Sequence, residues 1–215
     1  GVTVTIGGEI GHIGDVNSDV EDFEAFMAGY LSELNKKDLQ IISKVSVQTG
    51  TSHGGTPNPD GTLKDVSVDF GVLESIGKVA RDKYKMAGPV QHGASTLPHD
   101  MFGKFPDVGT VEIHLATGFL TIVYENMYDS TRNKLYEYVR SNFSEEKEEG
   151  WTDEQFIYKL RKKAIGPNKK DLWLMPEEEK NNIRAKLAEE LENLFQKLNI
   201  VGTSHTVRKY IENKS

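Results

Sequence analysis

Two stretches of this sequence share one arrangement, a short apolar strand that ends in His-Gly. The first stretch covers residues 45–55 and contains His53-Gly54, and the second covers residues 88–95 and contains His92-Gly93. A segment with helical periodicity separates them, which is typical of a parallel sheet with crossover helices. Parallel strands end at the same edge of a sheet, so we expect both imidazoles to lie there.

The same alternation of strand and helix extends over the first two thirds of the chain. Apolar spacing predicts helices over residues 19–34, 69–83 and 120–139. Alternating or β-branched residues predict strands over residues 2–6, 45–51, 88–92 and 110–116. Glycine and proline predict loops over residues 7–15 and 54–61. These units predict an α/β chain of the TIM, or (β/α)8, barrel type that contains about the second half of the barrel.

The composition changes after residue 143. A charged run at residues 145–150 has the character of a solvated link. Thr152 and Gln155 form a capping-box pattern that opens a helix to about Ala164, and Pro176 opens a long amphipathic helix to about Leu198. We therefore predict a half-barrel over residues 1–143 and a helical extension over 144–215, which packs on the barrel or on a partner subunit.

Composition limits the chemistry that this chain can carry. The 215 residues include no cysteine, so a transition metal would be held by His, Asp or Glu. A formal charge of -7 without a Lys/Arg stripe argues against nucleic-acid and anionic-membrane partners. There is no long apolar run and no basic-then-apolar leader, so we expect a cytoplasmic protein.

Polar residues are predicted at the ends of four successive strands, and they are Glu9, His53, His92 and His114. Imidazoles bind Zn²⁺, and a catalytic zinc commonly keeps three protein ligands and one open position. His53 and His92 would supply two of these ligands. Glu9 could be a ligand or a proton-handling carboxylate, or a loop carboxylate held by backbone N–H groups. Strand alternation turns His114 toward the barrel interior.

Small residues next to these histidines suit an anion or a monovalent cation. Gly54 and Gly93 would let backbone groups face a ligand, and Ser95 adds a hydroxyl. Thr117-Gly118 offers the same chemistry after the next strand. Tight turns are the alternative explanation for the glycines.

Taken in order, these motifs resemble the class II, metal-dependent ketose-bisphosphate aldolases. The motifs are Gly8-Glu9-Ile10-Gly11, residues 50–54, His92-Gly93-Ala94-Ser95 and Leu115-Ala116-Thr117-Gly118. The resemblance implies a TIM barrel, usually a dimer or tetramer, that cleaves a ketose bisphosphate. Fructose-1,6-bisphosphate, a glycolytic intermediate, is the commonest substrate and gives dihydroxyacetone phosphate and an aldehyde. In such enzymes zinc acts as a Lewis acid on the ketone.

The resemblance also assigns roles by position. His53 and His92 match two of the three zinc-binding histidines, and Glu9 matches a carboxylate near the metal. The loop that binds phosphate and a monovalent cation, Na⁺ or K⁺, is matched by Gly54, Gly93 and Ser95. A phosphate-binding threonine is matched by Thr117.

Some family features are missing from these motifs. The first zinc histidine and the adjacent catalytic aspartate belong to an earlier strand, which we expect in an N-terminal half that precedes Gly1 or is supplied separately. His114 and Ala116 occupy the positions where the family usually has Asn and Asp. The resemblance therefore does not determine which sugar is the substrate. Two alternatives remain: another metal-dependent lyase or epimerase of a sugar phosphate, and an aldolase-like scaffold subunit without catalysis.

Overall fold

The structure, a computed structural model, describes residues 5–11, 16–35, 39–51, 54–64 and 66–212. These residues form two compact units. The first unit is drawn from residues 1–53, 66–114 and 193–215, and the second from residues 54–65 and 115–192. Each unit combines segments that are distant in the sequence. The predicted division into a half-barrel over 1–143 and a helical extension over 144–215 is a division of the sequence, and it stays a prediction.

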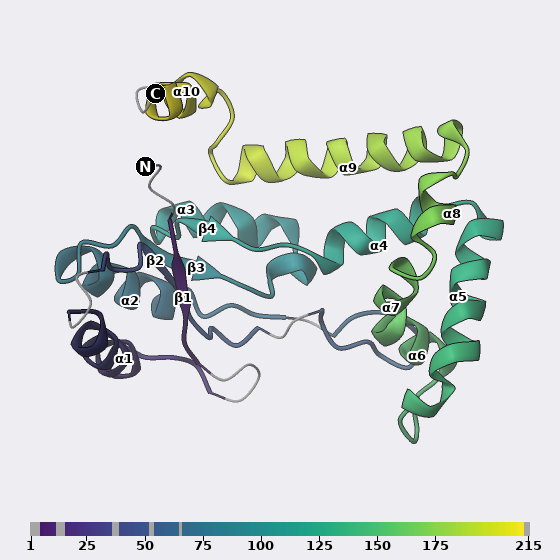
Figure 1. Cartoon of the computed structure of the whole chain (residues 1–215), viewed down its shortest axis with the longest axis horizontal. Coiled ribbons are helices and arrows are strands. Elements are labelled where there is room, and N and C mark those ends of the chain that lie inside the picture. The colour runs from purple at the N-terminus through teal and green to yellow at the C-terminus, as the bar shows by residue number, and fades with distance from the viewer. Residues whose placement is uncertain (1–4, 12–15, 36–38, 52–53, 65, 213–215) are drawn as a thin grey trace. The chain divides into compact units, whose positions relative to one another are not determined.

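The first unit is built on a parallel sheet of four strands (Figure 1). They are β1 (Gly7–Glu9), β2 (Lys44–Ser46), β3 (Gly88–Gln91) and β4 (Glu112–Ile113), and each pairs with the next in chain order. Helix α1 (Val20–Leu34) joins β1 to β2, and α2 (Phe70–Asp82) joins β2 to β3. Parallel strands in sequential order with helical crossovers are the topology of a (β/α)8 barrel segment, so the predicted α/β class is confirmed.

Local signals explain the two crossover helices. Asp19 caps α1 because its carboxylate accepts the backbone N–H of Asp22, whose side chain bonds back to Asp19. Asp69 caps α2 in a similar way, and the apolar face of that helix is buried. A Cβ on Gly77 would lie 2.9 Å from Pro89 Cδ, so glycine lets α2 lie directly on β3. Both helices match the predicted ranges.

The strands differ from the predicted ranges. Strand β1 covers Gly7–Glu9, where a loop was predicted, and Thr5 and Ile6 precede it. The glycine serves close packing here, since a Cβ on Gly8 would lie 2.8 Å from Ile42 Cδ1. The strands predicted at 45–51 and 110–116 shorten to β2 and β4. The connection between β3 and β4 contains the 3₁₀ turns Ala94–Thr96 and His99–Gly103 and the short helix α3 (Lys104–Asp107).

The second unit is helical. It contains α4 (Thr117–Asn126), α5 (Asp129–Phe143), the 3₁₀ turn Ser144–Glu146, α6 (Asp153–Leu160), α7 (Lys162–Ile165) and α8 (Lys169–Trp173). Helix α9 (Glu177–Lys197) belongs to this unit as far as Glu192, and the rest of α9 and α10 (Ser204–Glu212) belong to the first unit. The apolar core includes Tyr124, Leu135, Val139, Phe156 and Ile183. No helix in the described part of the chain is long and apolar enough to cross a membrane.

The predicted helix over residues 120–139 is two helices, α4 and α5. Met127 and Tyr128 are extended between them, with ψ of 152° and 146°. The carboxylate of buried Glu179 accepts the backbone N–H of Tyr128 at 2.9 Å and the hydroxyl of Thr131 at 3.1 Å. A residue remote in the sequence thus stabilises the break. The capping box of Thr152 and Gln155 and the long helix after Pro176 are present as predicted.

Candidate active site

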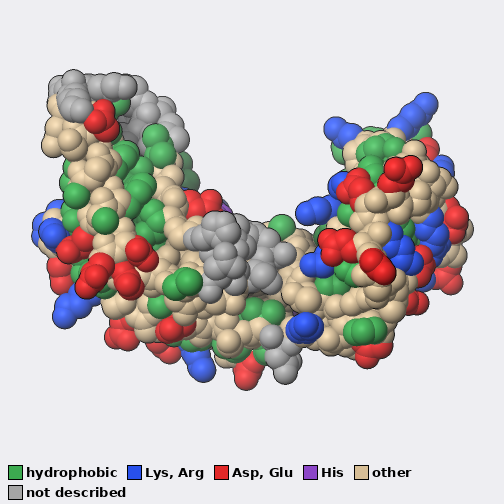
Figure 2. Space-filling view, turned by 90° about the horizontal axis from the view of Figure 1, so that it is seen from below, with side chains coloured by type: hydrophobic (Ala, Val, Ile, Leu, Met, Phe, Trp, Pro, Cys, Tyr) green, Lys and Arg blue, Asp and Glu red, His purple; other side chains and the backbone are tan. Residues whose placement is uncertain are grey.

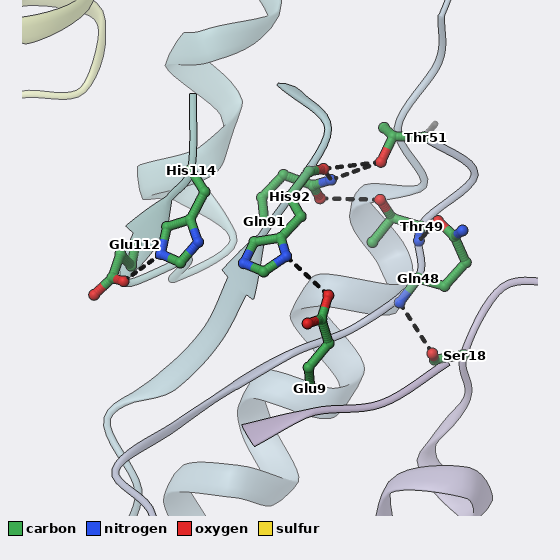
Figure 3. Close-up of polar contacts among 9 residues, drawn as sticks. All are labelled: Glu9, Ser18, Gln48, Thr49, Thr51, Gln91, His92, Glu112 and His114. Atoms are coloured by element: carbon green, nitrogen blue, oxygen red, sulfur yellow. Dashed lines mark hydrogen bonds and ion pairs between the residues drawn. The ribbon is translucent and has the colours of Figure 1, made fainter. Parts of the chain in front are cut away.

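Three of the predicted site residues meet at the carboxyl edge of the sheet (Figure 3). Glu9 ends β1, and His92 and His114 directly follow β3 and β4. His92 Nδ1 lies 2.9 Å from Glu9 Oε1. The imidazole rings of His92 and His114 are stacked, with centroids 4.2 Å apart and planes inclined by 26°. Side chains from three strands therefore form one polar cluster, as the strand-end pattern predicts.

A carboxylate and an ammonium group extend this cluster. Glu112 bonds His114 Nε2 through one carboxylate oxygen and Lys44 Nζ through the other. The hydrogen bonds from His114 and then Lys44 hold the pKa of the Glu112 carboxyl below its usual value, so this group carries a negative charge. Sequence reasoning did not assign a role to either residue, although strand alternation places Glu112 on the face that carries His114.

A buried polar network supports the turn at His92. Thr49 Oγ1 donates to Gln91 Oε1 at 2.9 Å, and Gln91 Nε2 donates to Thr51 Oγ1 at 3.1 Å. Thr51 Oγ1 in turn donates to the carbonyl oxygen of His92 at 2.9 Å. The sequence contains a signal for this polar turn, because Val-Gln-Thr-Gly at 47–50 and Val-Gln-His-Gly at 90–93 repeat one pattern.

Gly11 and Ser18 contact each other and the chain that follows β2. Ser18 N donates to the Gln48 carbonyl at 2.9 Å, and Gln48 N donates to Ser18 Oγ at 3.0 Å. Gly11 has φ of 93°, and a Cβ there would lie 2.6 Å from Ser18 Oγ, so only glycine fits. A cavity of about 20 Å³, room for roughly one water molecule, is lined by Glu9, Gly11, Gln48, Thr51 and His92 among others.

The predicted phosphate-binding residues fall into two groups. Gly93 has φ of 70° and turns the chain after His92 into the 3₁₀ turn that contains Ser95. Gly54 and Thr117 belong to the second unit, where a Cβ on Gly54 would lie 3.5 Å from Thr117 Oγ1. The hydroxyl of Tyr158, which sequence reasoning missed, donates to the Gly54 carbonyl at 2.7 Å.

Of the four remaining histidines, the structure describes His99 and His205. His53 and His12 lie outside the described residues, so the role of His53 stays a prediction. His99 Nδ1 lies 3.1 Å from Asn193 Nδ2, and His205 Nδ1 lies 3.1 Å from the Gly202 carbonyl. Neither histidine belongs to the cluster at the sheet edge.

The sheet edge carries imidazole and carboxylate groups, which are the donor types that bind zinc. No three His, Asp or Glu side chains among the described residues form a group that could hold a metal ion. A carboxylate accepts hydrogen bonds, so Nδ1 of His92 donates to Glu9, and in the neutral form of the ring the lone pair lies on Nε2. Zinc-bound histidines have such a carboxylate partner. The donor chemistry of the His92–Glu9 pair therefore fits zinc.

The stacked ring of His114 has different geometry. Its nitrogen lone pairs lie in a plane close to parallel with that of His92, because the rings face each other. The lone pairs of two such rings do not converge on one point between them. The stacked arrangement therefore does not suit a metal shared by the two rings.

The fold and its polar strand ends define an enzyme-like α/β scaffold of the barrel type. The sequence model of the family Fructose-bisphosphate aldolase class-II matches residues 1–198. The match covers most of the chain, so the chain belongs to this family, as the motifs predicted.

A search of curated proteins found no match. Among solved structures, the chain is similar to a crystal structure from Coccidioides immitis that is named provisionally as a fructose-1,6-biphosphate aldolase. The identity is 17%, the TM-score is 0.47, and the match covers 94% of this chain and 55% of that chain. The present chain thus spans about half the length of that protein.

Proposed function

We propose that this chain supplies part of the active site of a class II aldolase, a metal-dependent carbon–carbon lyase. The reaction would be cleavage of fructose-1,6-bisphosphate to dihydroxyacetone phosphate and glyceraldehyde 3-phosphate, or the reverse condensation. The observation that carries the proposal is the convergence of Glu9, His92 and His114 at the carboxyl edge of parallel strands. Family membership supports a lyase of this type.

The metal-binding residues in this proposal are His92 and His53, with Glu9 beside them. Zinc, when bound, would polarise the ketone carbonyl and stabilise the negative charge that develops on cleavage. Glu9 orients the imidazole of His92 through the 2.9 Å hydrogen bond and holds its Nδ1 proton. The exposed carboxylate of Glu9 is also available to take up a proton at the edge of the sheet.

The substrate would be held by groups that suit a sugar bisphosphate. Phosphate groups would be bound by Gly54, Gly93, Ser95 and Thr117, with Na⁺ or K⁺ as a companion ion. His114 would contact the sugar, since Glu112 fixes its ring. A homodimer or higher oligomer, an N-terminal half of the same enzyme and a cytoplasmic location belong to the same proposal.

A second candidate is a metal-dependent lyase or epimerase of another sugar phosphate. The observation that favours it is the Glu112–His114 pair, because a charged carboxylate beside an imidazole differs from the asparagine that is usual at this position. Triose-phosphate release from a panel of ketose bisphosphates distinguishes the two candidates. A scaffold subunit would bind no stoichiometric zinc and would cleave none of the sugars.

The test is His92→Ala in the natural full-length protein, with zinc content and fructose-1,6-bisphosphate cleavage as readouts. We expect zinc to fall well below one equivalent and cleavage to drop by at least about 10³-fold, since loss of a metal-binding imidazole removes the Lewis acid. His205→Ala is the matched control, because His205 lies in α10, where its ring contacts the nearby Gly202 carbonyl and Thr206 hydroxyl.

Zinc content and cleavage together distinguish a metal-binding role of His92 from a scaffold subunit. Full activity and full zinc in His92→Ala would remove His92 from the metal site. Zinc-free wild-type protein with no lyase activity would instead favour the scaffold alternative. The control His205→Ala should keep the zinc content and the cleavage rate of the wild-type protein.

A further inference from the structure

Lys44, Glu112 and His114 form a connected set of side chains in the first unit. Lys44 and Glu112 are the first residues of β2 and β4, and His114 directly follows β4. The carboxylate of Glu112 bonds Lys44 Nζ through Oε2 and His114 Nε2 through Oε1. Each carboxylate oxygen thus has its own partner, and the ring of His114 is held by a carboxylate that is itself anchored.

The neighbouring strand leaves room for Lys44. Gly7 of β1 is its register partner, and a Cβ on Gly7 would lie 3.3 Å from both Cγ and Cε of Lys44. The side chains of Lys44 and Glu112 are partly buried, and an ion pair is screened less there than on an open surface. The position of the Glu112 carboxylate is therefore fixed from the side opposite to His114.

The carboxylate of Glu112 selects the tautomer of His114. A carboxylate accepts hydrogen bonds, so Nε2 of His114 donates to Glu112, and in the neutral form of the ring the lone pair lies on Nδ1. His92 has the opposite arrangement, because its Nδ1 donates to Glu9. The neutral ring of His114 can therefore accept a hydrogen bond from a ligand but has no second proton to donate.

The ring of His114 is also held at its face. It stacks on the ring of His92, and Figure 3 shows the two rings between Glu112 and Glu9. The side chain of His114 is half-exposed, so a ligand can reach it from solvent. A contact at the edge of the ring and a contact at its face together restrict its rotation.

We propose that Glu112, anchored by Lys44, is a positioning residue that keeps Nδ1 of His114 as a hydrogen-bond acceptor for a hydroxyl group of a sugar phosphate. Asparagine, which is usual at position 114 in the family, offers both a donor and an acceptor. His114 beside Glu112 offers only the acceptor, so it selects a substrate with a hydroxyl donor at that point. The inference rests on the proposed function only in taking His114 as a sugar contact.

The first test measures the tautomer of His114 by long-range proton–nitrogen NMR on metal-free, natural full-length protein. At about pH 8, where histidine is usually neutral, the wild-type ring should carry its proton on Nε2. Glu112→Gln should also populate the form with the proton on Nδ1, because an amide can donate as well as accept. Glu74→Gln, an exposed position on α2, is the matched control and should leave the His114 signals unchanged. A wild-type ring with a proton on Nδ1 overturns the proposal.

The second test is a double-mutant cycle of Glu112→Gln and His114→Asn. Titration calorimetry of metal-free protein with fructose-1,6-bisphosphate gives each dissociation constant, and circular dichroism checks that each variant is folded. Glu112→Gln should weaken binding about tenfold, the effect of one hydrogen bond. In the His114→Asn background the same change should have an effect below about twofold, because Glu112 acts through the imidazole. Additive effects would indicate a merely structural role and overturn the proposal.

A change at Lys44 tests the anchor. Lys44→Met should change the tautomer and the affinity in the same direction as Glu112→Gln but by a smaller factor, since the carboxylate remains. Lys78→Met, at an exposed lysine of α2, is the matched control. Wild-type behaviour of Lys44→Met would remove Lys44 from the proposal. If Glu112→Gln does not fold, Lys44→Met takes its place in the cycle.

Selection of a hydroxyl group has its own readout. Wild-type protein should discriminate between ketose bisphosphates that differ in the configuration of one hydroxyl, and Glu112→Gln should reduce that difference in affinity. Wild-type protein that binds no sugar bisphosphate, or binds all of them equally, overturns the selection. The expected tautomer and coupled binding in a protein that releases no triose phosphate would contradict the aldolase proposal alone.

Discussion

The side chain of Glu112 connects two residues of the polar cluster, His114 and Lys44. Its carboxylate lies between the imidazole of His114 and the ammonium group of Lys44, and Lys44 and Glu112 are the first residues of their strands. Both partners stabilise the ionised form, the larger effect coming from His114. The orientation of the His114 ring thus depends on a residue that does not itself follow a strand.

We predict that Glu112 contributes to stability in a pH-dependent manner. Its folded-state pKa is lowered, so the contribution is present above the usual value of 4.5 and is lost as pH falls through the folded value. Glu112→Gln should be less stable than wild type at pH 7, and the difference should shrink between about pH 5 and pH 3. Urea unfolding at several pH values measures this difference.

Glu74→Gln is the control for that experiment, because Glu74 is an exposed glutamate of α2. Its effect on stability should be small at every pH. A Glu112→Gln deficit that stays constant down to pH 3 would contradict the proposed charge interaction.

At the scale of elements, Glu179 determines where α4 ends and α5 begins. The side chain is fully buried on α9, and its two oxygens bond the N-cap peptide of α5 and the hydroxyl of Thr131. A carboxylate at a helix start is favourable, because it accepts N–H groups and complements the helix dipole. One residue of α9 therefore connects that helix to the junction of two others.

We predict that Glu179→Ala lowers the free energy of unfolding by about 2–3 kcal/mol, since it leaves the Tyr128 N–H without its charged acceptor. Glu179→Gln, which keeps one acceptor and the volume, should cost less. Urea denaturation followed by circular dichroism measures both. Glu192→Ala, an exposed position on the same helix, should change stability by less than about 0.5 kcal/mol. Equal effects at 179 and 192 would refute the role given to Glu179.

The charge of the whole molecule limits its partners. The formal charge is -7, and on the face shown in Figure 2 Lys and Arg side chains are interspersed with Asp and Glu. A polyanion is repelled by such a surface except where local groups create a small site.

We predict no saturable binding of a labelled DNA duplex at micromolar protein and near-physiological salt, as measured by fluorescence anisotropy. A non-specific DNA-binding protein is the positive control. Binding that weakens steeply with added salt would contradict the prediction, because that dependence is the signature of phosphate neutralisation.

The sequence by itself determined the helices with strong local signals and the placement of polar residues after strands. Asp19, Asp69 and Thr152 cap their helices through bonds to residues two or three positions away, so a short window of sequence contains the cause. The strand-end rule likewise placed Glu9, His92 and His114 at one edge. The caps are short-range effects, and the position of the polar residues follows from the parallel order of the strands.

Only the tertiary structure decided the features that depend on distant residues. It placed β1 at Gly7–Glu9, because Gly8 packs on Ile42, and it divided α4 from α5 through Glu179. It also stacked His92 on His114. Each depends on contacts between side chains far apart in the chain, whose free energies local propensity does not contain.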